Sequence, residues 1–267
     1  MSAFATEEDF VLAASLVREA GALAFAMREE GLTGRQKTSV SDVVTAADHA
    51  AEKLVLETLR RLRPDDGIVG EEGASHQGTS GRTWVIDPVD GTYNFLSGST
   101  YWCSALALRP DEDADQPVDN PGVLLGAVFQ PQEDKLWLGG PGRAATLNGG
   151  ALPVLADAGL DRLSAGTYLH PTWLMRGEVA NPWTRAAAGA ATIRMLGSGS
   201  CDLGSVATGR LGVWFQHSCP EWDWLPGKAI VSAAGGRTTV VEVNGFRWHI
   251  AGTASAVREI EGALIRA

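Results

Sequence analysis

The sequence predicts a fold of the mixed α/β (α+β) class, on three observations. Two long helical patterns precede the first predicted strand, short apolar runs with strand character follow, and strands and helices alternate through the second half. A chain of 267 residues with 45% hydrophobic content is long enough for a full core, as one large domain or two packed halves. No long linker divides the chain, and we place the two halves at residues 1–145 and 146–267.

Both N-terminal helices are predicted from apolar residues at helical spacing. Thr6 followed by Asp9 resembles a capping box, which marks the start of a helix that continues until Gly31. A second helix is expected from Asp42 to Leu62, where Pro64 stops it. The expected apolar positions are Phe10, Ala13, Leu16, Val17, Ala20 and Ala24 in the first helix, and Ala46, Ala50, Leu54, Leu56 and Leu59 in the second.

Short runs rich in β-forming residues predict the strands of the first half. They lie at Gly67–Val69, Thr83–Ile86, Ser104–Arg109, Val123–Gln130 and Lys135–Gly139. The charged segment Asp111–Pro121 lies between two of these strands and predicts an exposed hairpin loop. A calcium loop is disfavoured there, because the spacing lacks the glycine and the terminal Glu of an EF-hand.

The second half is predicted to alternate between strands and helices. We expect strands at Arg162–Gly166, Thr192–Met195, Gly212–Gln216 and Thr238–Val243, and helices at Pro182–Ala190, Ser200–Thr208, Leu225–Ala234 and from Ala254 onward. An Asn244-Gly245 turn follows the last strand.

Charge argues against a nucleic-acid surface. The net charge is −10 and the pI is near 5.0, whereas phosphate-backbone binding needs clustered Lys and Arg. The one dense basic cluster, Arg60-Arg61-Leu62-Arg63, is expected at a helix C-terminus, where cations oppose the dipole. An acidic protein can still act on anionic phosphate esters when divalent metals reverse the local sign of the site.

The cysteines and the N-terminus predict a reduced, cytoplasmic setting without membrane contact. Cys103, Cys201 and Cys219 are odd in number and widely spaced, which indicates neither a disulfide framework nor a zinc site. The N-terminal residues are acidic where a signal peptide needs positive charge. The longest apolar runs are expected to be too short for a membrane span.

The segment Trp84–Phe95 carries the strongest chemical signal. Val85 and Ile86 predict a buried strand, Pro88 lies just past its end, and Gly91 lets the chain turn into a following helix. Asp87 and Asp90 can then face one point together with the carbonyl of Val89, and these are ligands for a hard cation. The N–H groups of Gly91 and Thr92 suit an anion, so metal and phosphate are expected to meet here.

This segment, DPVDGTYNF at Asp87–Phe95, resembles the signature of the inositol monophosphatase family. Further similar elements are the acidic pair in Val69–Gly73, the stretch Glu221–Ala229 with Ala234–Gly236, and the segments Gly126–Pro131 and Leu147–Gly150. The resemblance covers nearly the whole chain in family order. It implies a layered αβαβα sandwich and a homodimeric, lithium-sensitive phosphatase that needs two or three Mg²⁺ ions.

The resemblance also implies roles for individual residues. Glu71, Asp87 and the Val89 carbonyl are similar to ligands of a first ion that activates water, and Asp87, Asp90 and Asp223 to ligands of a second ion. Such a pair of ions lies about 3.5–4 Å apart. Thr92 and Asp48 are similar to residues that orient the attacking water with Glu71.

Other readings of these and neighbouring residues stay open. On sequence alone, Thr92 can also be a helix N-cap, which is compatible with its role toward water. Thr45 with Asp48 has capping-box spacing, and on sequence alone capping is the favoured role of this pair. Glu72 is a metal ligand or a solvated loop carboxylate, and Lys37 approaches the site or lies on the surface. His217 is expected to be structural rather than a general acid.

Substrate binding is expected to involve both halves of the chain. The predicted contacts are Asp90, Gly91, Thr92, Ser198, Gly199, Gln216 and Asp223. Gln216 stands where inositol phosphatases carry a glutamate, and Leu225-Pro226-Gly227 replaces the small residues that follow the metal-binding aspartate, with Pro226 expected in the first turn of a helix.

The predicted function is hydrolysis of a phosphate monoester of a small metabolite. An inositol 1-phosphate-like ester is the expected substrate, and histidinol phosphate is the alternative. The rival class is a non-catalytic metabolite-binding or regulatory protein on the same fold.

Overall fold

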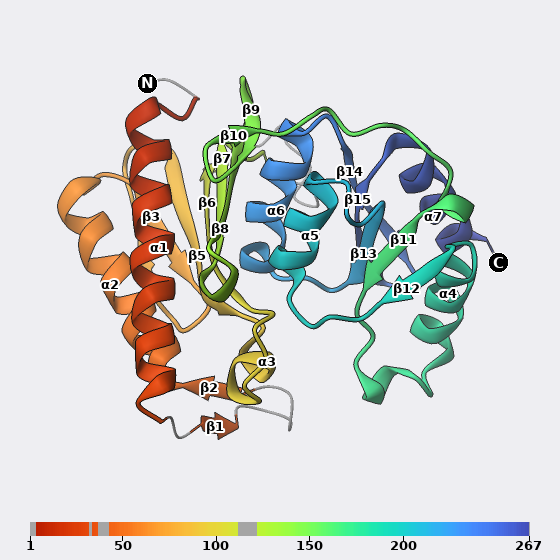
Figure 1. Cartoon of the computed structure of the whole chain (residues 1–267), viewed down its shortest axis with the longest axis horizontal. Helices are drawn as coiled ribbons and strands as arrows, with labels where there is room; N and C mark the ends of the chain where they lie inside the picture. The colour runs from red at the N-terminus through yellow and green to blue at the C-terminus, as the bar shows by residue number, and fades with distance from the viewer. Residues whose placement is uncertain (1–3, 32–33, 37–42, 112–121, 267) are drawn as a thin grey trace.

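The computed structural model describes residues 4–31, 34–36, 43–111 and 122–266 and is built of five layers (Figure 1). Helices α1 (Glu7–Glu29) and α2 (Ala46–Leu62) cover one face of an eight-stranded sheet. Helices α5 (Gly199–Ala207) and α6 (Glu221–Ala233) lie between this sheet and a five-stranded sheet, whose far face is covered by α4 (Gly177–Ala188) and α7 (Ala254–Ile265). The predicted αβαβα sandwich is confirmed.

Helix α1 forms as its sequence predicts. The Oγ1 of Thr6 accepts a hydrogen bond from the Asp9 amide at 3.2 Å, and the Thr6 amide donates to Asp9 Oδ2 at 3.0 Å, so the capping box is present. All six predicted apolar positions, Phe10, Ala13, Leu16, Val17, Ala20 and Ala24, are buried. They pack against the eight-stranded sheet.

Helix α1 is more apolar than the sequence analysis expected. An 18-residue window within its 23 residues has a mean hydropathy of 1.6, so by length and composition alone this helix could cross a membrane. One face of α1, however, packs on α2 and the sheet, which accounts for its apolar composition within the fold.

Helix α2 differs from its prediction in both its start and its buried face. It begins at Ala46, because Val43–Thr45 forms a short strand, β2, that pairs with β1 (Gly34–Gln36); Asp42 lies outside the described residues. The predicted positions Ala46, Ala50, Leu54 and Leu56 are not buried, and only Leu59 is. The buried face instead carries Ala47, Asp48, Ala51, Glu52, Val55 and Leu59. The buried face contains the acidic residues Asp48 and Glu52, so a pattern of apolar residues did not identify it.

The eight-stranded sheet has the order β10-β9-β8-β7-β6-β5-β3-β4. Its strands are β3 (Gly67–Gly70), β4 (Ser75–His76), β5 (Arg82–Asp90), β6 (Cys103–Pro110), β7 (Leu125–Gln130), β8 (Lys135–Gly140), β9 (Arg143–Leu147) and β10 (Gly150–Ala151). Neighbours are antiparallel except β3 and β5, which run parallel. The C-terminal ends of β3 and β5 therefore lie side by side, as ends of parallel strands do.

Strand β5 continues past the point where its sequence predicts an end. It includes Pro88 and reaches Asp90, with an irregular register against β6 between Asp87 and Asp90. A proline is tolerated at such a bulge because no regular ladder hydrogen bond is required of it. Residues 112–121, the main part of the predicted loop, lie outside the described residues; the flanking strands β6 and β7 pair antiparallel, as in a hairpin.

The five-stranded sheet has the order β12-β11-β13-β15-β14. Its strands are β11 (Ser164–Thr167), β12 (Thr192–Arg194), β13 (Val213–His217), β14 (Arg237–Val243) and β15 (Phe246–Gly252). Strand β11 is parallel to both β12 and β13, whereas β13–β15 and β14–β15 are antiparallel. The three parallel strands β11, β12 and β13 thus end at the same edge of this sheet.

Short 3-10 helices form parts of the connections between elements. They are η1 (Pro131–Glu133), η2 (Leu160–Arg162) and η3 (Pro171–Trp173).

Two helices contain a proline that the sequence placed at or near their start. Helix α4 begins at Gly177 with Pro182 inside it, and α6 begins at Glu221, which places Pro226 in the second turn rather than the first. A proline there removes one intrahelical hydrogen bond. Close packing accompanies it in α6: a Cβ on Gly126 of β7 would stand 2.1 Å from the Pro226 carbonyl oxygen, and one on Gly227 would stand 2.2 Å from Leu203 of α5.

Candidate active site

The first two acidic residues are brought together by the parallel pair β3 and β5. Gly70 is aligned with Ile86, and the amide of the next residue, Glu71, donates to the Ile86 carbonyl at 3.2 Å. Glu71 and Asp87, the residues that follow this pair, are therefore adjacent to each other at the ends of neighbouring strands. This is the edge at which sheets of parallel strands carry their ligands.

Asp87 is a buried carboxylate without a protein donor. Its side chain is 1% exposed, and neither Oδ1 nor Oδ2 has a hydrogen-bond partner among the described residues. Burial raises its pKa well above the usual range, and the charges of Glu71, Asp90, Asp223 and Asp48 raise it further. A buried ionised carboxylate in this position is costly unless a cation compensates it.

Asp90 is held by the start of helix α5. Its Oδ2 accepts the Ser200 amide at 2.5 Å and lies 3.9 Å from the Cys103 thiol. Burial raises the pKa of Asp90, while hydrogen bonds from the Ser198–Ser200 segment act in the opposite direction. The predicted substrate contacts Ser198 and Gly199 line the cavity, and they also fix this carboxylate.

Asp223 reaches the same group from the first turn of α6. Burial and the charges of Asp90 and Glu71 raise its pKa well above the usual range. A hydrogen bond with Asp87 would lower the pKa of Asp223, but two ionised carboxylates have no proton to donate and the Asp87 oxygens have no partner among the described residues. Since α6 begins at Glu221, the Asp223 side chain also lies near the positive end of this helix.

These residues fit a divalent cation by their chemistry. Among the described residues, no three His, Cys, Asp or Glu side chains already form a closed metal cage. Mg²⁺ does not need one, because it retains several waters and is bound by one or two carboxylates together with substrate oxygens. The orphaned oxygens of Asp87 are the observation that supports such an ion.

Gly91 lets the two halves of the site meet. It has φ = 92° and is the N-cap of the short helix α3 (Thr92–Leu96), so the alternative that Thr92 is the N-cap is wrong. A Cβ at Gly91 would stand 3.0 Å from the Gly197 carbonyl and 3.2 Å from Ser198 Cβ. The Asn94 amide then joins the halves by donating to Tyr101 O at 2.8 Å and Leu196 O at 2.7 Å.

Thr92 lies between the second helix and the strand end. Its Oγ1 is 3.1 Å from the Val89 carbonyl and 3.4 Å from Asp48 Oδ1 on α2. The hydroxyl has one hydrogen and donates to one of the two at a time. Asp48 is completely buried, which is compatible with a role that acts through Thr92.

Glu52 is a positioning residue that the sequence prediction omitted. Its two carboxylate oxygens accept the amides of Glu72 and Ala74, each at 2.8 Å. A Cβ on Gly70 would stand 2.1 Å from Glu52 Oε2, so the glycine is needed for this approach. The turn that carries Glu71 is thus fixed from α2. The signal in the sequence was an acidic residue four positions after Asp48, on the same helical face.

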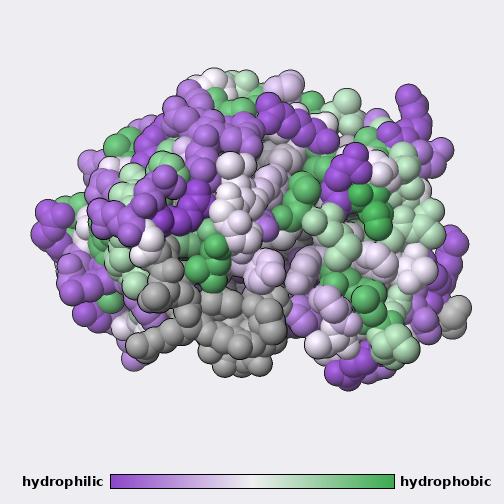
Figure 2. Space-filling view, turned by 60° about the horizontal axis from the view of Figure 1, so that its bottom comes forward, coloured by the Kyte–Doolittle hydropathy of each residue, from purple (hydrophilic) through white to green (hydrophobic). Residues whose placement is uncertain are grey.

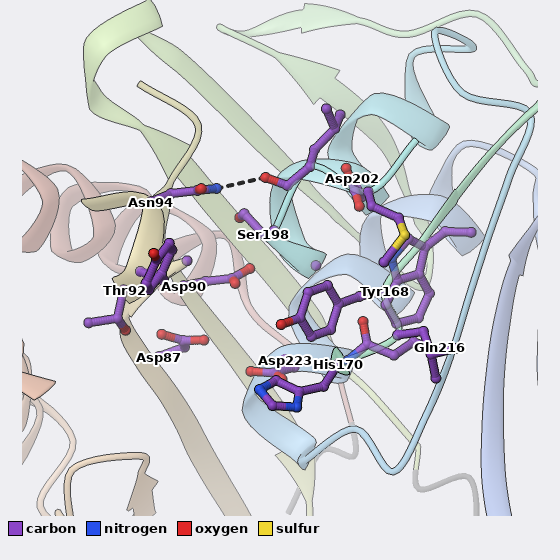
Figure 3. Close-up of a pocket in the computed structure, with 18 of the residues that line it drawn as sticks. Asp87, Asp90, Thr92, Asn94, Tyr168, His170, Ser198, Asp202, Gln216 and Asp223 are labelled. Atoms are coloured by element: carbon purple, nitrogen blue, oxygen red, sulfur yellow. Dashed lines mark hydrogen bonds between the residues drawn. The ribbon is translucent and has the colours of Figure 1, made fainter. Parts of the chain in front are cut away.

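All the predicted catalytic, metal-binding and substrate-binding residues except Asp48 line one cavity of about 870 Å³ (Figure 3). Glu71, Asp87, Val89, Asp90, Gly91, Thr92, Ser198, Gly199, Gln216 and Asp223 all border it. Glu72 does not, and its Oε2 lies 3.9 Å from His49 Nδ1. His217 does not line the cavity either. It is buried, and its ring centroid lies 5.0 Å from that of Trp173 and 5.3 Å from that of Trp248. Lys37 lies outside the described residues.

Part of the lining was not predicted. It comprises Tyr93, Asn94, Tyr168, Leu169, His170, Pro171, Thr172, Met195, Leu196, Asp202 and Trp214. Several of these follow the ends of the parallel strands β11 and β12. The order of these strands in the sheet was the missing information, because it places their ends at the cavity beside β13.

Comparisons with known proteins identify the family of this chain. A model of the inositol monophosphatase family matches residues 6–266. The inositol-1-monophosphatase of Rhizobium meliloti is 35% identical over 219 residues, which cover 77% of this chain and 74% of that protein. Nus factor SuhB of Xylella fastidiosa is 33% identical over 196 residues, or 73% of this chain and 68% of that protein. The crystal structure of the extragenic suppressor protein suhB from Bartonella henselae has a TM-score of 0.85 and 25% identity, and the match covers 98% of this chain and 100% of that one. The chain belongs to the inositol monophosphatase family.

Proposed function

We propose that this protein hydrolyses a phosphate monoester of a small metabolite in a Mg²⁺-dependent reaction. The observation that carries the proposal is Asp87, whose two buried oxygens lack any partner among the described residues while other acids surround it. Folding such a group has a cost that a bound cation offsets. Membership of a phosphatase family supports the same conclusion.

The chain's own residues divide the work at the metal end of the cavity. Glu71, Asp87 and the Val89 carbonyl would hold one ion, and Asp87, Asp90 and Asp223 a second. Bound Mg²⁺ supplies charge neutralisation at the phosphoryl and leaving oxygens and makes water more acidic. Asp87 would contribute to both ions, so its removal affects the whole site.

Thr92 and Asp48 would orient the attacking water. When the Thr92 hydroxyl donates its hydrogen to Asp48, its oxygen is left to accept a hydrogen bond from water. Glu71 offers a second acceptor on the same side of the cavity, so the water is held by two groups. Orientation of this kind lowers the entropic part of the barrier.

Inositol 1-phosphate is the first candidate substrate, since a relative at 35% identity is named an inositol-1-monophosphatase. Histidinol phosphate is the alternative. A relative named as a Nus factor supports the rival class of a regulatory protein, which would bind a metabolite without turning it over. We also propose a homodimer, which the family resemblance implies. A reducing, cytoplasmic setting is supported by the three buried, free cysteines.

The test is a phosphate-release panel with the purified chain. Inositol 1-phosphate, histidinol phosphate, glycerol phosphate, fructose 1,6-bisphosphate and adenosine 3′,5′-bisphosphate are compared with Mg²⁺ and with EDTA. We expect release from at least one ester with Mg²⁺ and loss of release in EDTA. No release from any ester would favour the regulatory class, and undiminished release in EDTA would contradict the metal-dependent mechanism.

A further inference from the structure

The cavity has a second wall that the phosphatase chemistry does not use. Figure 3 shows Tyr168, His170 and Gln216 on the side opposite Asp87, Asp90 and Thr92. We call the group Tyr168, His170, Thr172, Met195, Leu196 and Gln216 the outer wall. With the phosphate held at the acidic end, the alcohol of the ester would contact this wall.

The outer wall is made of rings and apolar chains rather than charges. Its polar groups are a phenol, an imidazole, an amide and one hydroxyl, and its apolar members Met195 and Leu196 are 45% and 37% exposed. Figure 2, which turns the lower side of Figure 1 toward the viewer, shows hydrophobic residues in separate patches among hydrophilic ones on this side of the molecule. The wall is therefore suited to a partly apolar ligand.

The segment that carries the two rings is held rigidly at both ends. Before it, Trp183 Nε1 donates to Thr167 Oγ1 at 2.9 Å at the end of β11. After it, the Trp173 ring packs edge-on against Phe246 at 5.3 Å and His217 at 5.0 Å. A wall fixed in this way loses little conformational entropy when a ligand binds.

The tautomer of His170 is set by its neighbour. The Thr172 amide donates to His170 Nδ1 at 3.3 Å, and Thr172 Oγ1 lies 2.8 Å from the same nitrogen. A ring nitrogen that accepts a backbone hydrogen bond carries no proton, so the neutral imidazole has its hydrogen on Nε2. His170 is thus a flat ring with one N–H donor.

The rings of Tyr168 and His170 lie close together and are steeply inclined to each other. Their ring centroids are 6.4 Å apart and their planes meet at 63°. A flat ligand that stacks on one of these rings presents its edge to the other, which is a favourable arrangement for aromatic groups. The Gln216 side chain adds an NH₂ donor group and a carbonyl acceptor, which match the nitrogen atoms of a heterocycle.

A polyol fits this wall less well. Each hydroxyl of a cyclitol needs a partner when it leaves water. The ring faces and aliphatic chains of the wall supply none, so only its four polar groups could serve these hydroxyls. A heterocycle offers π-faces to the rings and only its edge atoms need hydrogen bonds.

We propose that the outer wall selects phosphate monoesters whose alcohol carries a planar nitrogen heterocycle, over esters of open polyols and cyclitols. The inference rests on the proposed phosphatase function and decides between its candidate substrates. The heterocycle can be an imidazole, as in histidinol phosphate, or a purine, as in adenosine monophosphate, and the two are separate arms of the test.

The kinetic test compares kcat/KM for histidinol phosphate, adenosine 5′-monophosphate, inositol 1-phosphate and glycerol 2-phosphate. Tyr168→Leu keeps an apolar side chain without a ring, and Tyr168→Phe is the matched control that keeps the ring. We expect Tyr168→Leu to lower kcat/KM about 10- to 100-fold for at least one ring-bearing ester, the range typical of lost stacking. Glycerol 2-phosphate should be nearly unaffected, and Tyr168→Phe should retain most of the preference. Equal losses for all four esters, or inositol 1-phosphate as the preferred ester, would overturn the inference.

A binding measurement separates this inference from the phosphatase proposal. Adenosine, histidinol and inositol carry no phosphate, so their binding to the unmodified chain and to both variants can be followed by NMR without turnover. Weaker binding of adenosine or histidinol to Tyr168→Leu, with inositol bound poorly throughout, supports the outer-wall assignment even if no ester is hydrolysed. Binding of inositol in preference to both heterocycles would overturn the assignment even if the chain is an active phosphatase.

Discussion

Two groups of buried acids lie at opposite ends of strand β5, and the groups differ in how their charge is compensated. At the start of the strand, Asp9 and Asp66 are 1% and 2% exposed. At its end, Asp87 and Asp90 are 1% and 7% exposed. The two groups are therefore buried to a similar extent, and they differ in the side chains that surround their carboxylates.

The acids at the start are paired within the protein. Arg82 Nη1 donates to Asp9 at 2.8 Å and its Nη2 donates to Asp66 at 2.8 Å, while Arg63 Nε donates to Asp9 at 2.9 Å. Trp84 Nε1 adds a hydrogen bond to Asp66 at 2.8 Å. Burial alone would raise the pKa of Asp9, but hydrogen bonds from Thr6, Arg63 and Arg82 outweigh it and lower the pKa.

The acids at the end have acidic neighbours instead. Among the described residues, Asp87, Asp90 and Asp223 form no ion pair with Lys or Arg, and the pKa of each is raised, first by burial. The comparison teaches that buried acids paired with arginines stabilise the fold, whereas buried acids without a cationic partner require a cation from solution. Four predictions test this difference.

The largest effect is expected for Asp87→Asn. Loss of the carboxylate that would serve both ions should lower kcat by at least about 10³, or roughly 4 kcal/mol of transition-state stabilisation. In EDTA the variant should be at least as stable as the unchanged chain, because a buried unpaired charge has been removed. Phosphate release and urea unfolding measure the two quantities. The exposed Asp161→Asn serves as control; a folded Asp87→Asn variant with near-normal turnover would contradict the bridging role.

The opposite result is expected for Arg82→Met at the other end of the strand. Removal of the shared cation leaves Asp66 without an ionic partner and should reduce the free energy of unfolding by about 3 kcal/mol. The phosphatase activity of the remaining folded protein should be retained. Lys53→Met removes an exposed ion pair of 3.8 Å as control and should change the stability by less than about 0.5 kcal/mol. If both substitutions cost the same, the network at Arg82 is not the stabilising element proposed.

A smaller effect is expected for Glu52→Gln. The glutamine has one carbonyl oxygen to accept the two amides that Glu52 accepts now, so the turn with Glu71 should loosen. We expect about a tenfold rise in the Mg²⁺ concentration needed for half-maximal activity, roughly 1.4 kcal/mol. Glu57→Gln, on the exposed side of the same helix, is the control. An unchanged Mg²⁺ requirement would show that Glu52 does not position the turn.

The smallest effect concerns acid unfolding. Since the pKa of Asp9 is lowered below the ordinary value of 3.8, its ionised form stabilises the fold above that pH. This contribution should disappear as the pH falls through the lowered pKa. The difference in stability between the unchanged chain and Asp9→Asn should therefore be constant near neutral pH and shrink below pH 3.8. A difference that grows on acidification would reverse the sign assigned to Asp9.

The acidic end of the site could be predicted from the sequence, whereas its outer wall could not. Asp87 and Asp90 follow an apolar run within one short segment, so local pattern was sufficient. Glu52 was missed because an acid on a buried helical face contradicts the hydrophobic pattern of α2. Tyr168 and His170 depend on β11 lying between β12 and β13, and the order of strands in a sheet is not encoded in any one strand.

The most direct test is the change in the urea unfolding free energy of the unchanged chain, Arg82→Met and Asp87→Asn when EDTA is replaced by saturating Mg²⁺. A cation bound by the native state alone adds about 2.7 kcal/mol at a concentration one hundred times its Kd. We predict a gain of this order for the unchanged chain and for Arg82→Met, and a much smaller gain for Asp87→Asn. Equal gains in all three proteins would contradict the claim that the acids at the end of β5 are completed by a metal ion.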